Sequence, residues 1–421
     1  MGRHLHRGRG PGGAVLGAEQ PGGCATDRGH PRSARGGLGQ SFRPPVSVAV
    51  MTRDRPRLLA GTLRAIRRLR YRPFELIVIG DRLHWSDLAA QAGIDWLGEG
   101  DVVYRHCPEL SVSRARNLAL AAAEGEILAF CDDDAIPAPN WLCELIPAFE
   151  DTRVAAAGGL VRAACGDKIE SLGFRVDSLG NVDPMPWDGR AERCIHPPTP
   201  GAQVVFRGVN SAFRIAALRA IGGVDPRYRY FLEETDAIVR LAAAGGSVAL
   251  CPGAEIRHLS AENRHRDRRG KPRDPYEIAA STALFLRKLS LKETLQISIL
   301  KKFFCDWQRR IDHLLRLAVF SASDRDWVEA RLRAGVVAGL VRAARPAKPL
   351  ASRPTDKACH GAGWIADQPS PAPPALNPAG QSFADRDATR DPGFPGQIDL
   401  DPALAGSREK TTCNWAFPPA Q

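Results

Sequence analysis

The sequence lacks any long hydrophobic run. No stretch approaches the roughly 18 consecutive apolar residues that a membrane-spanning helix needs. Residues 1–20 are too polar and too rich in glycine to contain the apolar core of a signal peptide. The sequence therefore argues against an integral membrane protein, and we expect a cytoplasmic one.

Closely spaced cysteines are also missing. The 10 cysteines are scattered along the chain, and no two of them form a Cys-x-x-Cys pair. Zinc ribbons and the disulfide frameworks of small secreted domains both need tighter spacing. The sequence therefore favours neither class, and it contains no internal repeat.

The chain does have an ordinary globular composition with an excess of positive charge. Hydrophobic residues make up 44% and charged residues 25%, which is enough apolar material for a sizeable core. Lysine and arginine number 58 against 47 acidic residues, a net charge of +11. This balance favours anionic partners, which include nucleotides, nucleic acid and an anionic membrane surface.

Composition divides the chain into four parts. Residues 1–43 are rich in Gly, Arg and Pro and are expected to form a disordered arm. Residues 44–275 alternate short β-rich runs with helical patterns, which predicts an α/β catalytic domain. Residues 276–343 predict a helical extension, and residues 344–421 lack periodicity and are expected to form a disordered tail.

Strands and helices are expected to alternate through the second part. The strands are predicted at residues 46–51, 74–79, 102–105, 127–131, 154–161, 204–206, 247–250 and 254–257. The helices are predicted at residues 57–69, 113–123, from about 140, 215–220 and 234–244. Residues 166–200 show no regular pattern and predict an irregular segment.

Three consecutive carboxylates follow the predicted strand at residues 127–131. Side chains alternate along an extended segment, so Asp132 and Asp134 can point the same way. Packed carboxylates repel unless a divalent cation lies between them, and hard oxygen ligands suit Mg²⁺ or Mn²⁺. The alternative is an acidic turn that caps the next helix. Ligands bind at the carboxyl ends of strands in open α/β sheets, which favours the metal site.

A second acidic group opens the predicted helix at residues 234–244. Glu233, Glu234 and Asp236 lie within one helical turn. Acids in the first turn are common because they complement the helix dipole. A catalytic base at a helix start fits the same residues equally well, so the sequence leaves both interpretations open.

Three further positions carry candidates. Asp81 ends the second strand, where a carboxylate can bind a nucleotide, although a turn aspartate is frequent there too. Arg116 lies near a helix start that could bind a diphosphate; the alternative is a solvated start capped by Ser113. His258 follows the last strand, and a lone histidine is more often structural than a ligand.

These motifs follow one another in a recognisable order. The series comprises residues 46–56, 74–81, 115–117, 125–134, 137–142, 208–214, 222–225 and 233–236. Each motif is weak alone, but the ordered series resembles the family 2 glycosyltransferases of bacterial type. The resemblance covers residues 46–289 and implies a GT-A fold, in which a Rossmann-like nucleotide-binding sheet has a mixed second half.

The resemblance also implies roles for particular residues. Mg²⁺ or Mn²⁺ would be held on the donor diphosphate by Asp132, Asp134 and His258, with Asp134 the first choice. The general base would be Glu234, with Glu233 and Asp236 as neighbouring candidates. The substrate-binding residues expected are Thr52, Asp54, Asp81, Arg116, Asp133 and Asn210, and among these Asp81 would contact the nucleobase.

On this basis we expect an inverting, metal-dependent glycosyltransferase. It would move a sugar from a nucleotide-diphosphate sugar to the hydroxyl of a glycan or lipid-linked acceptor, in polysaccharide or cell-envelope glycan synthesis. Nucleic acid is not an expected partner, because no nucleic-acid-binding motif accompanies the basic loop at residues 264–273. The alternatives are an inactive nucleotide-sugar-binding protein and an aspartate-dependent phosphatase. The phosphatase is disfavoured because the acidic cluster follows a fourth strand rather than the first.

Basic and apolar residues are interleaved in residues 284–320. Eight cations outnumber three acids there, and Phe303, Phe304 and Trp307 lie among them. This pattern suits a helix on the anionic inner face of a membrane, which would make the protein peripheral. The interpretation we favour is that the apolar stripe packs on the catalytic domain, as helical stripes usually do.

Overall fold

The fold is known over most of the chain. The computed structural model describes residues 42–166, 168–177, 182–190, 192–265, 267, 273–289, 293–347 and 364–365. The predicted arm at residues 1–43 and the predicted tail at residues 344–421 lie almost wholly outside the described residues.

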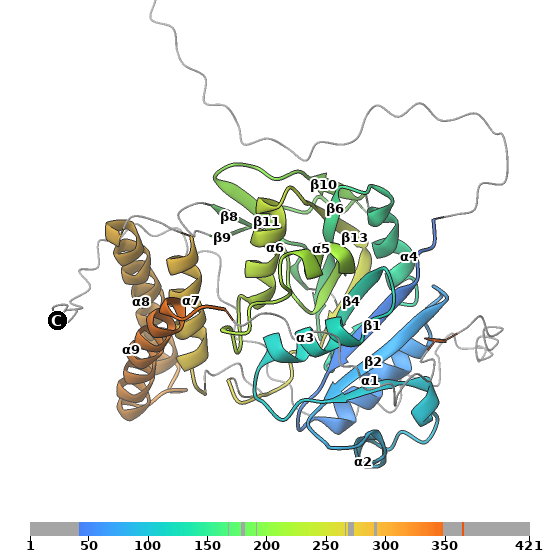
Figure 1. The fold of residues 1–421 in the computed structure, drawn as a ribbon. Coiled ribbons are helices and arrows are strands. Elements are labelled where there is room, and N and C mark those ends of the chain that lie inside the picture. The colour runs from blue at the N-terminus through green and yellow to red at the C-terminus, as the bar shows by residue number, and fades with distance from the viewer. Residues whose placement is uncertain are drawn as a thin grey trace, which may run out of the picture.

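A mixed β-sheet forms the centre of the molecule (Figure 1). Over the described residues its strand order is β10-β13-β6-β12-β4-β1-β2-β14, with β3 beside β2, β5 beside β13 and β7 beside β6. The strands β3, β2, β1 and β4 are parallel, and β12 runs antiparallel between β4 and β6. The predicted α/β class with a mixed second half is therefore confirmed.

The elements have the following bounds. The strands are β1 Val46–Met51, β2 Phe74–Gly80, β3 Val103–His106, β4 Ile127–Asp132, β5 Ala135–Pro137, β6 Val154–Ala163, β7 Ile169–Ser171, β8 Phe174–Asp177, β9 Val182–Pro184, β10 Cys194–His196, β11 Ala202–Val205, β12 Asn210–Arg214, β13 Ser247–His258 and β14 Trp364–Ile365. The helices are α1 Pro56–Arg67, α2 Trp85–Ala92, α3 Val112–Ala122, α4 Trp141–Leu145, α5 Ile215–Ala220, α6 Glu233–Ala243, α7 Tyr276–Lys288, α8 Glu293–Arg316 and α9 Ala322–Ala344, with short 3₁₀ turns at Glu99–Asp101 and Ile146–Glu150.

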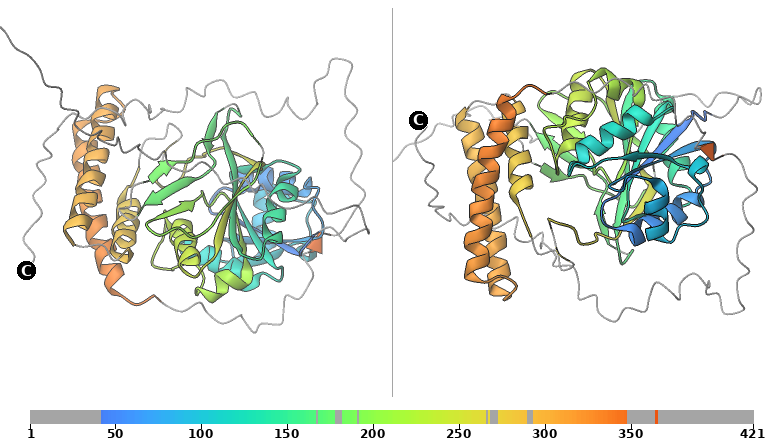
Figure 2. Two further views of the ribbon diagram at one scale, coloured as in Figure 1. Left: turned by 90° about the horizontal axis from the view of Figure 1, so that it is seen from above. Right: turned by 60° about the horizontal axis from the view of Figure 1, so that its bottom comes forward.

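Helices cover both faces of the sheet. Apolar residues of α1, α2 and α4 pack with one set of alternating strand residues, which includes Val48 and Val50 of β1. Residues of α3, α5 and α6 pack with the other set, which includes Ala49. Figure 2 shows the sheet between these helical layers. Burial on both faces explains why the parallel strands read as continuous apolar runs in the sequence.

The register of the parallel strands brings their carboxyl ends to one edge. Met51 of β1 lies opposite Ile79 of β2 and opposite Asp132 of β4. Residues that directly follow these three strands therefore share the same edge of the sheet. The acidic motif of β4 and the candidates after β1 and β2 are among them.

Two segments differ from the sequence prediction. The strands expected at residues 247–250 and 254–257 are one strand, β13, with a register shift between Cys251 and Glu255. Proline and glycine at positions 252 and 253 weaken the strand pattern and mark this bulge. The stretch at residues 166–200, expected to be irregular, contains β7 to β10, which are too short to show a period of two.

The helical extension forms its own apolar cluster. The residues of α8 expected to make an apolar stripe, including Phe304, Trp307 and Ile311, are buried among residues of α7 and α9. The stripe therefore packs against neighbouring helices rather than on the sheet domain. A Cβ at Gly339 of α9 would lie 2.2 Å from the carbonyl oxygen of Ala280, so glycine lets α7 and α9 approach closely.

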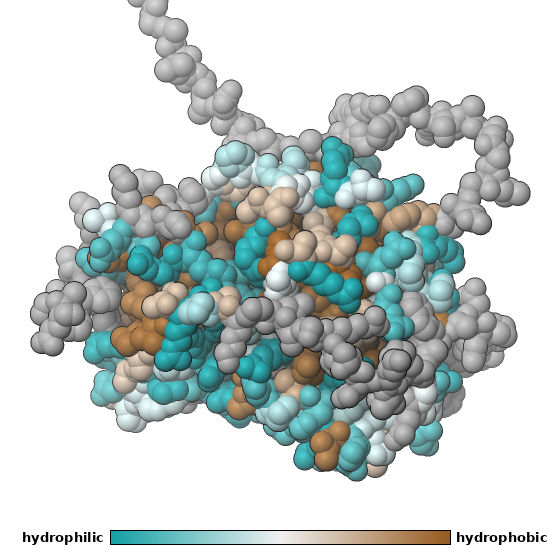
Figure 3. Space-filling model, viewed as in Figure 1, coloured by the Kyte–Doolittle hydropathy of each residue, from teal (hydrophilic) through white to brown (hydrophobic). Residues whose placement is uncertain are grey.

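The surface of the extension is partly apolar. Trp327, Val337, Leu340 and Val341 of α9 are exposed, and Figure 3 shows apolar surface over the helical part at the left of the molecule. Within the part of the chain that the structure describes, no helix is both long enough and apolar enough to cross a bilayer.

The described cysteines include both free and bonded ones. Cys107, Cys131, Cys143, Cys165 and Cys251 are free. Cys194 and Cys305 are each disulfide-bonded, which their spacing in the sequence did not indicate.

An ionic cluster joins the extension to the sheet domain. Lys288 of α7 donates to Asp225 over 2.8 Å and also pairs with Asp236 of α6. Burial raises the pKa of Asp225, but hydrogen bonds from Arg227 and Lys288 outweigh burial and hold that pKa well below its usual range. A carboxyl whose pKa is depressed by folding stabilises the fold above its unfolded-state pKa of about 4 and loses that contribution as the pH falls.

We expect Lys288→Met to lower the free energy of unfolding at pH 7 by about 1–3 kcal/mol, because two buried carboxylates lose a charged donor. The difference from the native chain should shrink below about pH 4, where Asp225 becomes protonated in the unfolded chain. Urea unfolding at pH 7 and pH 3 measures both effects.

Lys302→Met is the matched control. Lys302 is 64% exposed and pairs with Asp306 over 3.4 Å on the surface of α8. Its removal should change stability by less than about 0.5 kcal/mol. Equal losses for the two lysines would contradict a special role for Lys288.

Candidate active site

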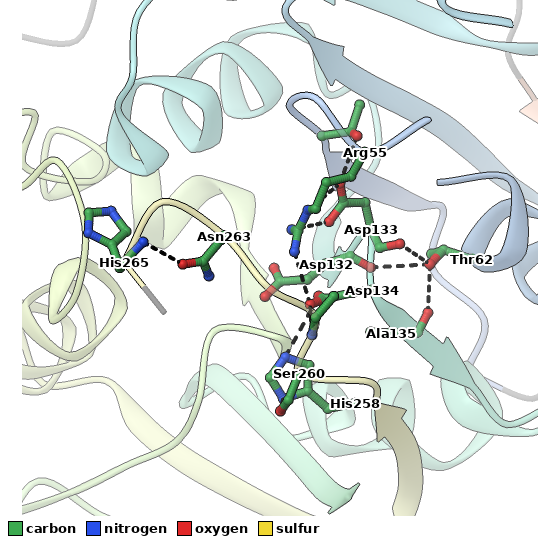
Figure 4. Close-up of polar contacts among 12 residues, drawn as sticks. Arg55, Thr62, Asp132, Asp133, Asp134, Ala135, His258, Ser260, Asn263 and His265 are labelled. Atoms are coloured by element: carbon green, nitrogen blue, oxygen red, sulfur yellow. Dashed lines mark hydrogen bonds and ion pairs between the residues drawn. The ribbon is translucent and has the colours of Figure 1, made fainter. Parts of the chain in front are cut away.

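The turn after β4 holds one aspartate inward (Figure 4). Asp133 is 0% exposed, accepts a 2.7 Å hydrogen bond from Thr52 and forms an ion pair with Arg55. Burial raises the pKa of Asp133 to about 7, whereas the positive charge of Arg55 lowers it. The Thr62 hydroxyl donates to the backbone carbonyls of Asp133 and Ala135 and so fixes the turn. Asp133 is therefore held by Thr52 and Arg55 and is not one of the candidate metal ligands.

Asp132, Asp134 and His258 come together at the edge of the sheet. Each offers one ligand atom, and these atoms lie within 4.8 Å of one another. His258 reaches the site because β13 pairs with β5 in the register His258–Ala135. The three residues predicted from the sequence as metal ligands therefore lie together.

The donor set fits Mg²⁺ or Mn²⁺. Two carboxylates and an imidazole are suitable ligands for these cations, and ligand atoms about 2.1 Å from one ion lie about 3–4 Å apart. The Asp134 Oδ1 atom is 3.7 Å from His258 Nε2. The other oxygen, Oδ2, is occupied by Arg55 at 3.1 Å and by the amide of Ala261 at 3.0 Å. Oδ1 is thus the atom of Asp134 that faces the candidate metal position.

A pair of carboxyl groups lies at the end of β1 and β2. Asp54 follows β1 with a φ of 54°, and Asp81 follows β2. Hydrogen bonding to the neighbouring Asp81 carboxyl, burial and the negative charge of Asp81 raise the pKa of Asp54. The two predicted substrate-binding residues therefore form one acidic group on the same edge as Asp132.

The acidic start of α6 separates into residues with different environments. Glu233 is 5% exposed and lies 3.5 Å from Arg116, which is itself 3% exposed. Glu234 is half-buried, and burial together with the charge of Glu233 raises its pKa to about 8. Phe231 and Leu232, just before the helix, both have positive φ values of 74° and 67°. Two such residues in succession are costly, and strain of this kind is concentrated at functional sites.

Asp236 belongs to the ionic cluster of the helical extension. Its carboxylate accepts from Arg240 over 2.7 Å and from Tyr228 over 3.2 Å, and it pairs with Lys288. These contacts leave Asp236 anchoring α6, so the structure does not support its prediction as a catalytic residue.

Two further predictions are corrected. Asn210 is 0% exposed, and its amide binds Trp141 Nε1 and the carbonyls of Leu160 and Ala254 at 2.8–3.0 Å. It ties strands together inside the sheet rather than binding substrate. Asp133 and Thr52 were also expected to bind substrate. The Asp133 carboxylate instead pairs with Arg55 and accepts a hydrogen bond from the Thr52 hydroxyl, so both side chains contact other protein residues.

The start of α3, which carries Arg116, is not the solvated helix start capped by Ser113 that the sequence offered as an alternative. Ser111 caps α3 by accepting from the amide of Arg114, whereas Ser113 is buried. Arg116 is not solvated: its guanidinium lies over the ring of Phe130, 4.6 Å from the centroid. It therefore contacts Glu233 from inside the protein.

Sequence reasoning missed two residues of the site. Arg55 directly follows the motif residue Asp54. An arginine beside an acidic motif could have indicated an ion pair with the site's carboxylates. Glu170, whose Oε2 lies 3.0 Å from His258 Nδ1, falls in the stretch expected to be irregular and gave no signal.

The comparison with protein families agrees with this arrangement. The family model of glycosyl transferase family 2 matches residues 47–210, which span β1 to the start of β12 and include the acidic turn. Residues 47–210 belong to glycosyl transferase family 2. The protein is therefore a glycosyltransferase with the GT-A type of fold that the sequence predicted, which excludes the phosphatase alternative.

Several named proteins are similar to this chain. The succinoglycan biosynthesis protein ExoM of Rhizobium meliloti (strain 1021) is 28% identical over 229 residues, which cover 52% of this chain and 68% of ExoM. The glucosyl-dolichyl phosphate glucuronosyltransferase of Haloferax volcanii is 30% identical over 120 residues, 27% of this chain and 37% of that protein. Among solved structures, the mannosyltransferase PcManGT from Pyrobaculum calidifontis in complex with GDP-Man and Mn²⁺ aligns with a TM-score of 0.40 and 15% identity, over 72% of this chain and 88% of that one.

We expect Asn210→Ala to lower the free energy of unfolding by about 2–4 kcal/mol, because it leaves Trp141 Nε1 and two carbonyl groups without this buried partner. Binding of UDP or GDP by the folded protein should not change. Urea unfolding and nucleotide titration measure the two quantities.

Asn140→Ala is the control, since the amide of Asn140 makes only an exposed 3.4 Å contact with Glu144. Its effect on stability should stay within about 0.5 kcal/mol. A stable Asn210 variant with weakened nucleotide binding would restore the original prediction.

Proposed function

We propose that the protein is a metal-dependent, inverting glycosyltransferase that moves a sugar from a nucleotide-diphosphate sugar to an acceptor hydroxyl. The observation that carries this proposal is the ligand set of Asp132, Asp134 and His258 on the same sheet edge as Asp54 and Asp81. Membership of family 2 supports the reaction class.

The diphosphate would be held at the ligand set. A bound Mg²⁺ or Mn²⁺ supplies positive charge to the leaving diphosphate. Asp134 presents Oδ1 for this purpose because Arg55 and the Ala261 amide hold its other oxygen. Asp132, at the end of β4, contributes the second carboxylate. Asp54 and Asp81 would accept hydrogen bonds from the nucleoside, since carboxylates at strand ends suit ribose and base donors.

Glu234 is the better candidate for the general base. An acceptor hydroxyl must lose its proton as it attacks, and a base works best when its pKa lies near the working pH. The raised pKa of Glu234 meets this condition. Glu233 is more deeply buried and lies 3.5 Å from the Arg116 guanidinium, so its carboxylate is already paired inside the protein. Glu233 and Arg116 would therefore hold the start of α6 in place beside Glu234.

The acceptor is proposed from the relatives. ExoM is named for succinoglycan biosynthesis, and the Haloferax relative for transfer to glucosyl-dolichyl phosphate. A glycan or lipid-linked acceptor in polysaccharide or cell-envelope synthesis is consistent with both names. A lipid-linked acceptor would also give the protein a reason to work at a membrane surface, where its net positive charge would assist.

The proposed function is tested by incubating the full chain with a panel of nucleotide sugars and following release of the nucleoside diphosphate. We expect Mn²⁺-dependent release that EDTA abolishes and that Asp134→Asn reduces to background. Asp326→Asn, an exposed change on α9, should retain full activity. An inactive binding protein would bind nucleotide but release no product with any donor, and that result would overturn the proposal.

We expect Glu234→Gln to lower kcat by about 10²–10⁴ while nucleotide affinity changes little, because a general base acts on the acceptor. In the native protein, kcat should rise with pH through about 8 and level off above it, since only the deprotonated carboxylate can accept the proton. Steady-state kinetics between pH 6 and 9 check both expectations. A larger fall in kcat for Glu233→Gln would assign the base to Glu233 instead.

A further inference from the structure

Glu170 of β7 lies behind the candidate metal ligands. Its side chain is 7% exposed. The Oε2 atom is 3.0 Å from His258 Nδ1 and 3.5 Å from Arg207 Nη1, and Oε1 accepts a 3.1 Å hydrogen bond from Ser260. One buried carboxylate therefore contacts His258 and the residue two positions after it.

Strand pairing fixes this arrangement. The end of β6 lies between β13 and β7, with Ala163 opposite His258 and Arg162 opposite Ile169. Glu170 and His258 thus reach each other across the end of one strand. Their positions depend on the sheet rather than on a free loop.

The residues that follow His258 form hydrogen bonds with Asp134. The amide of Leu259 donates to the Asp134 carbonyl over 2.8 Å, and the amide of Ala261 donates to Asp134 Oδ2 over 3.0 Å. Ser260 between them has a φ of 50°, in the left-handed region. Its hydroxyl bond to Glu170 holds this turn in place.

The contact with Glu170 also determines which nitrogen of His258 is available. A carboxylate accepts hydrogen bonds, so Nδ1 of the imidazole carries the proton that it donates to Glu170. In the neutral ring Nε2 is then unprotonated and presents a lone pair. Nε2 is the nitrogen that lies 3.7 Å from Asp134 Oδ1.

We infer that Glu170 is a positioning residue for the metal site. It holds the His258 ring and the turn at Ser260 so that Nε2 and Asp134 Oδ1 are preset for one cation. The inference rests on the proposed function, since it needs Asp132, Asp134 and His258 to bind the metal. Carboxylates that orient metal-binding histidines in this way strengthen metal binding without touching the ion.

The test is direct titration of the full chain with Mn²⁺, followed by the electron paramagnetic resonance signal of free Mn²⁺, with and without GDP or UDP. We expect Glu170→Ala to bind Mn²⁺ about 10–100-fold more weakly than the native protein. Glu170→Gln keeps an oxygen that can accept from Nδ1, so its affinity should lie between the two. In a His258→Ala background, adding Glu170→Ala should cause no further loss, because Glu170 acts through His258.

Glu255→Ala is the matched control. Glu255 lies on β13 and pairs with Arg162 at 2.8 Å instead of with His258. Its removal should leave Mn²⁺ affinity unchanged. Thermal unfolding of each variant establishes that the compared proteins are folded.

Three outcomes with the Glu170 variants would overturn the inference. A folded Glu170→Ala protein with native Mn²⁺ affinity is the first, and equal further loss in the His258→Ala background is the second. If Glu170→Ala does not fold, native affinity in Glu170→Gln is the third.

The Asp134→Asn variant separates the inference from the proposed function: undiminished Mn²⁺ binding in that variant would overturn both. Loss of binding there with no effect at Glu170 overturns the inference alone.

Discussion

The buried ion pair between Arg55 and Asp133 is the interaction on which the site depends. A carboxylate with no contact to solvent is costly unless a cation and hydrogen bonds compensate it, and Arg55 and Thr52 do so. With Asp133 held by these partners, Asp132 at the end of β4 and Asp134 in the turn each offer a carboxylate oxygen to the candidate metal position beside His258. The same arginine occupies one oxygen of Asp134 and leaves the other for a cation. A single guanidinium thus holds two of the three consecutive acids.

The two halves of the sheet contribute different parts of the site. The parallel half brings Asp54, Asp81 and Asp132 to one edge because β1, β2 and β4 end in register. The mixed half adds His258 through the antiparallel pairing of β13 with β5. An order of strands that differed at β12 or β13 would leave the carboxylates without their nitrogen ligand. The site therefore lies where the parallel part of the sheet meets the mixed part.

Helix α6 is anchored on both sides of the candidate base. Arg116 pairs with Glu233 on one side, and Lys288 and Arg240 pair with Asp236 on the other. Glu234 lies between these two anchored acids. Because Lys288 comes from α7, the helical extension contributes to the position of this helix start. The extension is thereby connected to the chemistry of the sheet domain, although none of the predicted catalytic residues lies in it.

The sequence by itself determined the α/β class, the strands β1, β2 and β4, and the residues that could hold a metal, because long apolar runs and an ordered series of motifs are local signals. It could not assign different roles to Glu233, Glu234 and Asp236, because all three are acidic and lie in one helical turn. Only the tertiary structure distinguished them, because it pairs Glu233 with Arg116 and Asp236 with Arg240 and Lys288. It also showed Asn210 to be a core residue and revealed Glu170, whose strand is three residues long. Hydrogen bonds between residues far apart in the chain decide these roles, and no period or spacing in the sequence records such partners.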